Sequence, residues 1–146
     1  MSGHGARILW TAGDGNDGDY GKDHRWEFAG GESVRASTAA SFGGNPDYVD
    51  PEKGLVAALA SCYMLTFLAL AHKFGNRVLR YEDNADCEIG RTDDGRKAVT
   101  RITLNPEVQF ADGQAPDAAG LAKLHVSAHK YCFIANSVKS EVVINH

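Results

Sequence analysis

The pattern of apolar and charged positions singles out one long segment in the middle of the chain. From Gly54 to Ala71 no residue is charged, and apolar or small side chains would fall on every face of a helix rather than in one stripe. Asp50 and Pro51 are typical of a helix start, and Gly75 is typical of a helix stop. The pattern therefore predicts one helix over 50–75 that is enclosed on nearly all sides.

A membrane span is the first alternative for this segment. The uncharged run is at the short end of the roughly 20 apolar residues that a span needs. It is also rich in alanine and contains hydroxyl and thiol side chains at Ser61, Cys62 and Thr66. We interpret it as the central helix of a soluble protein and expect no association with a membrane.

Short alternating segments before the helix predict strands. Ala6–Thr11 has the pattern of a strand, and Gly13–Gly21, which is rich in glycine and aspartate, has that of a loop. His24–Phe28 and Ser33–Thr38 alternate polar and apolar residues on either side of a glycine pair. This arrangement predicts a β-hairpin.

The chain after Gly75 predicts more strands and a second helix. Pro116 and Asp117 open that helix, and its apolar side ends at Cys132. The predicted strands form an antiparallel meander, turned at 93–95, and a separate last strand: Val78–Tyr81, Asp86–Gly90, Lys97–Leu104, Val108–Phe110 and, at the end of the chain, Glu141–Ile144.

The order of these elements predicts an α+β fold in a single domain over residues 1–146. A helix that is apolar on all sides needs to be covered on two opposite sides. The predicted strands add up to about one modest sheet, which can cover only one of them. A second subunit is the simplest source of the other wall. We therefore expect a two-fold homodimer with the central helices near its axis.

Composition and charge narrow the function classes. The chain is 43% hydrophobic and 23% charged, as in an ordinary globular protein. A net charge of −4 without blocks of like charge gives no support for binding to nucleic acid or anionic membranes. Met1–Ile8 lacks the features of a signal peptide, so we expect a cytoplasmic protein. In that reducing compartment three cysteines are catalytic, metal-binding or merely buried.

Two of the cysteines together suggest a functional site, although one alone would not. Cys62 alone is explained by packing, because free cysteine is buried as a small hydrophobe. The second predicted helix, however, places another thiol at Cys132 on its buried stripe. Cys87 has no partner motif, and we interpret it as a residue of strand packing.

Two motifs resemble those of a known family. Pro51-Glu52 is followed by an aliphatic and alanine stretch to Cys62, and Cys132-Phe-Ile-Ala-Asn-Ser follows an Ala-His pair. Together with Trp26–Gly31 and Asn105–Val108, these motifs are similar to those of the OsmC/Ohr family of osmotically inducible and organic hydroperoxide resistance proteins. The resemblance implies antiparallel β-sheets wrapped around central helices in an intertwined homodimer. It also implies thiol-dependent reduction of organic hydroperoxides, and we expect no cofactor.

A peroxidase thiol must react as the thiolate, which an apolar site opposes. A positive charge or a network of donors therefore has to lie close to Cys62. In the resembling proteins an arginine does this, held by the glutamate that matches Glu52. The position that matches this arginine is Lys22, so either Lys22 or the nearby Arg25 is expected to fill the role. Lysine lacks the planar fork of arginine, so this is the main departure from the family pattern.

The remaining roles follow from the same resemblance. Cys132 lies at a helix C-terminus, where the dipole disfavours a thiolate, so it suits a resolving thiol. Cys62 would form a sulfenic acid and then a disulfide with Cys132. An outside thiol (a small dithiol, a lipoyl protein or thioredoxin) would reduce that disulfide. An apolar pocket with Tyr63, Phe67 and Phe133 as contributors would favour bulky organic peroxides.

Two other classes of function stay open at this point. His125, His129 and Cys132 have a spacing that can place three donors on zinc or another transition metal. Capping and dipole compensation explain the two histidines as well, and we favour that interpretation over a metal site. The third class is a module that binds a small apolar ligand in the dimer cleft without turnover.

Overall fold

The computed structural model describes residues 3–13 and 20–146. They form an α+β fold, as the pattern predicts, in two compact units, Met1–Gly54 and Leu55–His146. The single domain stays a prediction. Most of the loop predicted at Gly13–Gly21 lies outside the described residues.

The first unit contains the predicted hairpin, extended by one strand. β1 (Ala6–Leu9), β2 (His24–Phe28) and β3 (Ser33–Ala36) form an antiparallel sheet in that order. The hairpin turns at Gly30 and Gly31, which both have positive φ and so suit glycine. Alternation gives the sheet one apolar face, with Ile8, Trp26 and Val34 in register, and one face with Arg7, Arg25, Glu27 and Arg35.

The long helix is confirmed together with both of its end signals. α1 spans Pro51–Lys73. The Asp50 carboxylate accepts a hydrogen bond from the backbone N–H of Lys53 at 2.8 Å, which caps the first turn. Gly75 adopts φ 76° just past the last turn. A 3-10 helix, η1 (Ala40–Phe42), lies in the loop that leads to α1.

The burial of α1 differs from the expected enclosure on all sides. Its buried residues lie in one stripe, while Leu65 on another face is 62% exposed. The helix is thus covered on one side only within a single chain. By length and composition α1 is also long and apolar enough to cross a membrane, which is weak support for a span because core helices pass the same test. The buried stripe consists of Val56, Leu59, Tyr63, Phe67 and Ala71.

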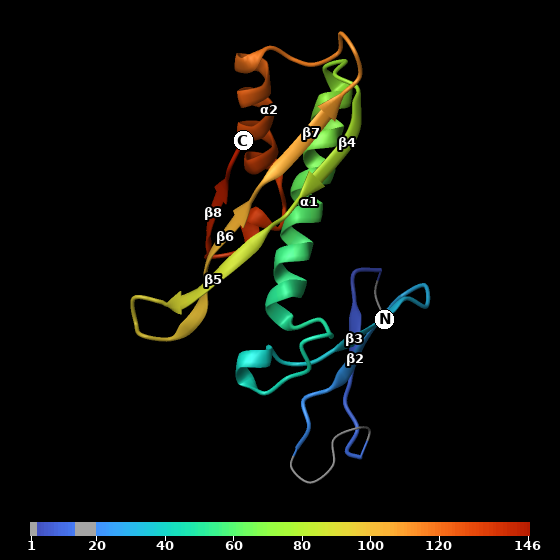
Figure 1. Cartoon of the computed structure of the whole chain (residues 1–146), viewed down its shortest axis with the longest axis vertical. Helices are drawn as coiled ribbons and strands as arrows, with labels where there is room; N and C mark the ends of the chain where they lie inside the picture. Colours follow the sequence, from blue (N-terminus) through green and yellow to red (C-terminus); the bar gives the residue numbers. More distant parts are fainter. Residues whose placement is uncertain (1–2, 14–19) are drawn as a thin grey trace. The chain divides into compact units, whose positions relative to one another are not determined.

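The strands of the second unit form a ribbon rather than the predicted meander (Figure 1). β4 (Val78–Asp83) pairs with β7 (Pro106–Phe110), and β5 (Asp86–Arg91) pairs with β6 (Lys97–Leu104), both antiparallel. The register continues across the break, because Asp83 faces Pro106 before it and Asp86 faces Thr103 after it. The meander prediction was wrong since β4 and β5 follow one another along the same ribbon instead of lying side by side.

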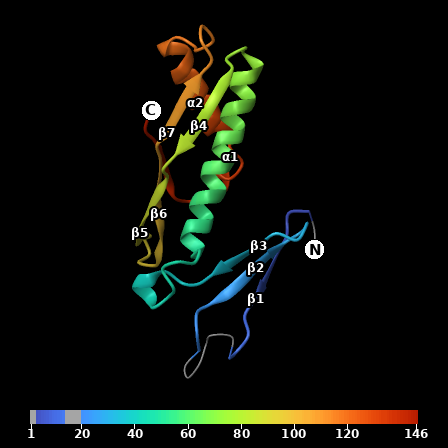
Figure 2. The ribbon, with the colours of Figure 1, turned by 45° about the vertical axis from the view of Figure 1, so that its right-hand side comes forward.

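The second unit ends with two helices and a strand. α2 (Ala118–Tyr131) begins at Asp117, whose side chain accepts from the N–H of Gly120. A 3-10 helix, η2 (Ala135–Ser137), follows α2, and β8 (Glu141–Ile144) pairs with β6. That pairing is parallel, so the sheet β5-β6-β8 is mixed rather than purely antiparallel. Within the second unit the ribbon runs alongside α1, and α2 is partly covered by the ribbon in this view (Figure 2).

The core of the second unit lies where the two helices meet this ribbon. Its fully buried side chains come from α1, from β6 and from the end of α2, and burial of each large one contributes roughly 1.5–3 kcal/mol. One member of this set is a cysteine, so the core contains a thiol. The set is Leu59, Tyr63, Phe67, Ile102, Leu104 and Cys132.

Candidate functional site

The structure brings two of the three cysteines together in the second unit. Cys62 lies in the middle of α1 and is half-buried, whereas Cys132 is the C-cap of α2 and is fully buried. The two thiols lie close enough for each to shift the pKa of the other. Residues that are far apart in the sequence thus form one dithiol site, with one sulfur partly open to solvent and the other behind it.

The turn that follows Cys132 surrounds both sulfurs with backbone donors. The N–H of Ala135 donates to Sγ of Cys132 at 3.4 Å. The N–H groups of Phe133 and Ile134 and the Thr66 hydroxyl lie near the Cys62 thiol and favour its thiolate. Because α2 ends at Cys132, these N–H groups are not used inside a helix and can point at the sulfurs.

These surroundings move the pKa values of the two thiols in opposite directions. Partial burial raises the pKa of Cys62, but the donors from Ile134, the Cys132 thiol, Phe133 and Thr66 outweigh it, so the pKa lies below the usual value. For Cys132, burial raises the pKa and the neighbouring Cys62 raises it further. Cys62 is therefore the sulfur that ionises first.

The sequence predicts a positive charge or a network of donors near Cys62, but it did not identify the groups that act as donors. Thr66 could have been found, because it lies four residues after Cys62 and so on the same helix face. Its hydroxyl donates to the carbonyl oxygen of Cys62 at 2.9 Å. The N–H groups of Phe133 and Ile134 leave no signal in the sequence, since every residue except proline carries one.

Lys22, Glu52 and Arg25 all lie in the first unit. Nζ of Lys22 donates to the carbonyl oxygen of Tyr20 at 2.9 Å and lies 3.6 Å from the centroid of the Tyr20 ring. Lys22 and Pro51 line the same hollow of about 430 Å³, beside the first turn of α1 where Glu52 is half-buried. Within residues 3–13 and 20–146, Glu52 forms an ion pair with neither Lys22 nor Arg25. Their action on Cys62 stays a prediction.

The three residues expected to line a substrate pocket are in different settings. Tyr63 and Phe67 are fully buried. The Tyr63 hydroxyl lies 2.8 Å from Nδ1 of His125, and the Phe67 ring packs against His125 with centroids 4.8 Å apart. Both side chains are therefore core residues, and their contacts with His125 hold α1 against α2. Phe133, next to Cys132, is 80% exposed and presents its ring to solvent.

The metal interpretation of His125, His129 and Cys132 gains nothing from the geometry. His125 is buried, its Nδ1 faces Tyr63, and its ring stacks on that of His146. Burial, followed by the nearby His146, lowers the pKa of His125 to about 4. Among the residues that the structure describes, no three His, Cys, Asp or Glu side chains are grouped so that they could hold a metal ion. Cys87 is half-buried on β5 and packs against the core.

The chain is similar to known proteins in sequence and in fold. Residues 44–146 match the family described as OsmC-like protein. The structure is similar to that of an OsmC-like protein of unknown function from Vibrio cholerae O1 biovar eltor, with 39% identity over 99% of both chains and a TM-score of 0.91.

More distant similarity extends to two organic hydroperoxide resistance proteins. That of Legionella pneumophila is 13% identical over 99% of this chain and 96% of its own, with a TM-score of 0.71. That of Elizabethkingia anophelis is 16% identical over 96% and 90%, with a TM-score of 0.72. At such identities the likeness shows the fold alone. None of the curated proteins compared with the chain matches it.

Proposed function

Because the chain belongs to the OsmC-like family, we propose that it is a thiol-dependent peroxidase that reduces organic hydroperoxides. One observation carries the proposal. A half-buried thiol with a lowered pKa, Cys62, lies against a buried thiol with a raised pKa, Cys132. A peroxidase that works through an attacking and a resolving thiol needs this asymmetry.

In the first step the Cys62 thiolate attacks the terminal oxygen of the peroxide. An S–O bond forms and the O–O bond breaks, so the sulfur is oxidised to a sulfenic acid and the peroxide is reduced to an alkoxide, which takes a proton and leaves as the alcohol. The N–H groups of Phe133 and Ile134 and the Thr66 hydroxyl support the attacking thiolate. The two N–H groups are fixed by the backbone and so need no rearrangement before the attack.

In the second step the sulfur of Cys132 attacks the sulfenic sulfur of Cys62. An S–S bond forms, the S–O bond breaks, and the departing hydroxide takes up the Cys132 proton as water. Contact between the thiols before reaction means that little movement is needed. A small dithiol, a lipoyl protein or thioredoxin then reduces the disulfide by thiol exchange, and both cysteines return to thiols.

For the positive charge that assists Cys62, we favour Lys22 over Arg25. Lys22 lines a hollow together with Pro51, the residue before Glu52. Arg25 instead stands opposite Arg35 on the charged face of the sheet. In this proposal Glu52 orients Lys22 once a peroxide is bound.

The preference for organic peroxides is supported by apolar side chains at the open side of the site. Leu65, three residues after Cys62 on α1, is 62% exposed, and Phe133 is 80% exposed. A bulky apolar peroxide would remove their surface from water, at about 25 cal/mol per Å², and hydrogen peroxide would not. Tyr63 and Phe67 hold the helix from the core side.

The one-sided burial of α1 supports the proposed intertwined homodimer. The helix carries no charge from Gly54 to Ala71, but only one stripe of its surface is buried within a single chain. A second copy would cover the remaining apolar surface near a two-fold axis. We propose that this dimer is cytoplasmic.

Thiol titration before and after addition of cumene hydroperoxide tests the function. We expect two of the thiols in each subunit to disappear and mass spectrometry to find the Cys62 peptide linked to the Cys132 peptide. Cys87→Ser is the matched control and should lose two thiols as the parent does. Cys132→Ser should stop at a sulfenic acid on Cys62. If the parent keeps all its thiols, the peroxidase proposal fails, and binding of an apolar ligand without turnover becomes the better account.

A further inference from the structure

Two arginines face each other on the polar face of the first sheet. Arg25 of β2 and Arg35 of β3 are cross-strand partners, so their side chains leave the sheet on the same face. Like charges directly opposite each other destabilise an antiparallel pair. On the same face Arg7 is compensated by Glu27, with Nη1 and Oε2 2.8 Å apart. In the part of the chain that the structure describes, neither Arg25 nor Arg35 has an acidic partner.

Arg25 and Arg35 both line a hollow of about 400 Å³. Its wall includes Tyr48 and, among the residues that the structure describes, one acidic side chain, Asp23. Oδ1 of Asp23 accepts a hydrogen bond from the Ser37 hydroxyl at 2.9 Å. The hollow thus concentrates positive charge in a space large enough for a small ligand.

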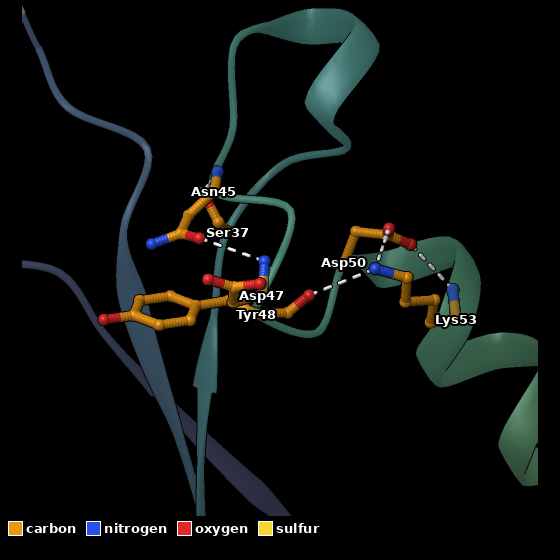
Figure 3. Close-up of polar contacts among 6 residues, drawn as sticks. All are labelled: Ser37, Asn45, Asp47, Tyr48, Asp50 and Lys53. Atoms are coloured by element: carbon orange, nitrogen blue, oxygen red, sulfur yellow. Dashed lines mark hydrogen bonds and ion pairs between the residues drawn. The ribbon is translucent and has the colours of Figure 1, made fainter.

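The Tyr48 ring contacts the guanidinium of Arg35 and restrains it. The central carbon of the guanidinium lies 4.8 Å from the centroid of the Tyr48 ring, a cation–π contact that restrains the side chain. The carbonyl oxygen of Tyr48 accepts from Nζ of Lys53 at 3.2 Å, and Lys53 is itself tied to Asp50 (Figure 3). The same figure shows the Tyr48 ring extending away from these contacts toward the strands. Arg35 therefore needs little ordering when a ligand binds.

We propose that this hollow binds a divalent phosphate group between Arg25 and Arg35. Guanidinium forks match the oxygen pairs of phosphate and form strong charge-assisted hydrogen bonds with them. A phosphate with two negative charges compensates both arginines, whereas a single carboxylate compensates one. The inference does not rest on the peroxidase proposal, because it concerns only side chains of the first unit.

Isothermal titration of the full-length protein with inorganic pyrophosphate at low salt tests the site. The parent protein should bind in the submillimolar range, and Arg35→Ala should weaken binding by about tenfold or more. Arg35→Lys keeps the charge but loses the fork, so it should recover only part of the affinity. Tyr48→Leu should also weaken binding, because it frees Arg35 to move.

Arg80→Ala is the matched control for general loss of positive charge. Arg80 is an exposed arginine of the second unit that is already paired with Glu82, so its loss should leave pyrophosphate binding unchanged. Thermal unfolding with and without pyrophosphate shows whether a variant is folded, and the ligand should stabilise the parent but not Arg35→Ala. No binding by the parent, equal weakening in Arg80→Ala, or acetate bound as tightly as pyrophosphate would each overturn the assignment.

Discussion

The hydroxyl of Tyr63 on α1 lies 2.8 Å from Nδ1 of His125 on α2, and this contact joins the two helices inside the core. The carbonyl oxygen of His125 lies 3.3 Å from the same hydroxyl. Tyr63 follows Cys62 directly, so the contact anchors the helix turn that carries the attacking thiol of the proposed mechanism. It also places a titratable ring where it must stay neutral.

The first prediction concerns this buried histidine. Its pKa is about 4 in the folded protein, below the value of 6.5 for an exposed histidine. The unfolded chain therefore binds more protons, and the free energy of unfolding should fall as pH drops from 6.5 toward 4, by about 2–3 kcal/mol from this group. Urea unfolding at pH 7 and pH 4.5 measures it. His125→Gln should lose less stability than the parent over this range, and an equal loss would contradict the assignment.

The second prediction concerns Thr66. Thr66→Val removes a hydroxyl that stabilises the Cys62 thiolate while keeping the size of the side chain, so the thiol pKa should rise. The rate of cumene hydroperoxide consumption at pH 6 should drop by about three- to tenfold, and less at high pH where Cys62 is ionised anyway. Ser61→Ala is the control, because that hydroxyl donates to Ala58. A loss that is the same at every pH would indicate a structural defect.

The third prediction separates the two candidate cations. If Lys22 assists Cys62, Lys22→Ala should slow peroxide consumption about tenfold near pH 7 and shift the pH profile upward, whereas Arg25→Ala should react nearly as the parent. The opposite pattern would assign the role to Arg25. If both variants match the parent across the pH range, the backbone and Thr66 donors are sufficient, and the charged-partner mechanism is abandoned.

The fourth prediction concerns a buried carboxylate on the ribbon. Oδ1 of Asp83 accepts from the N–H of Asn105 at 2.7 Å, but Oδ2 and the nearby Tyr81 hydroxyl are buried without a hydrogen-bond partner among the described residues. Burial raises the pKa of Asp83, with the Asn105 N–H as a partial offset, so ionisation costs the folded state stability as pH rises through that pKa.

Asp83→Asn removes this cost and keeps the oxygen that accepts from Asn105. It should stabilise the protein by about 1 kcal/mol at pH 7, and the gain should vanish below the ordinary aspartate pKa of 3.8. Urea unfolding across pH 3–7 measures the difference. The exposed Asp86→Asn is the control and should change little at any pH.

Local signals predicted the helices well, while pairing and burial needed the structure. Asp50 and Gly75 mark the ends of α1 through their own backbone and side-chain chemistry, so the sequence alone locates them. The pairing of β4 with β7 and the parallel pairing of β6 with β8 depend on residues far along the chain, which no local pattern records. For the same reason Tyr63 and Phe67 could not be told from pocket residues.

The candidate site was also predicted only in part from the sequence. The two cysteines were found because a thiol is a rare group and two of them lie on predicted helices. The donors to Cys62 come mostly from the backbone after Cys132, and backbone groups are the same in every sequence. What distinguishes Phe133 and Ile134 is only that the helix has ended before them.

The register of the ribbon connects its hairpin turn to the distant core, although it shifts between Glu88 and Ile89 and again between Val78 and Arg80. The chain reverses where the N–H of Thr92 donates to the carbonyl of Arg96 at 2.8 Å and Gly95 takes φ 85°. Between these two shifts one register runs from Glu88 to Arg80, so a further slip of one residue that passed from the turn beyond Glu88 would move the side chains of this stretch to the opposite face. Tyr81 would then leave its place beside Phe67, and the wall behind the dithiol would be lost. The fidelity of a solvent-exposed turn thus decides whether the interior can assemble at all.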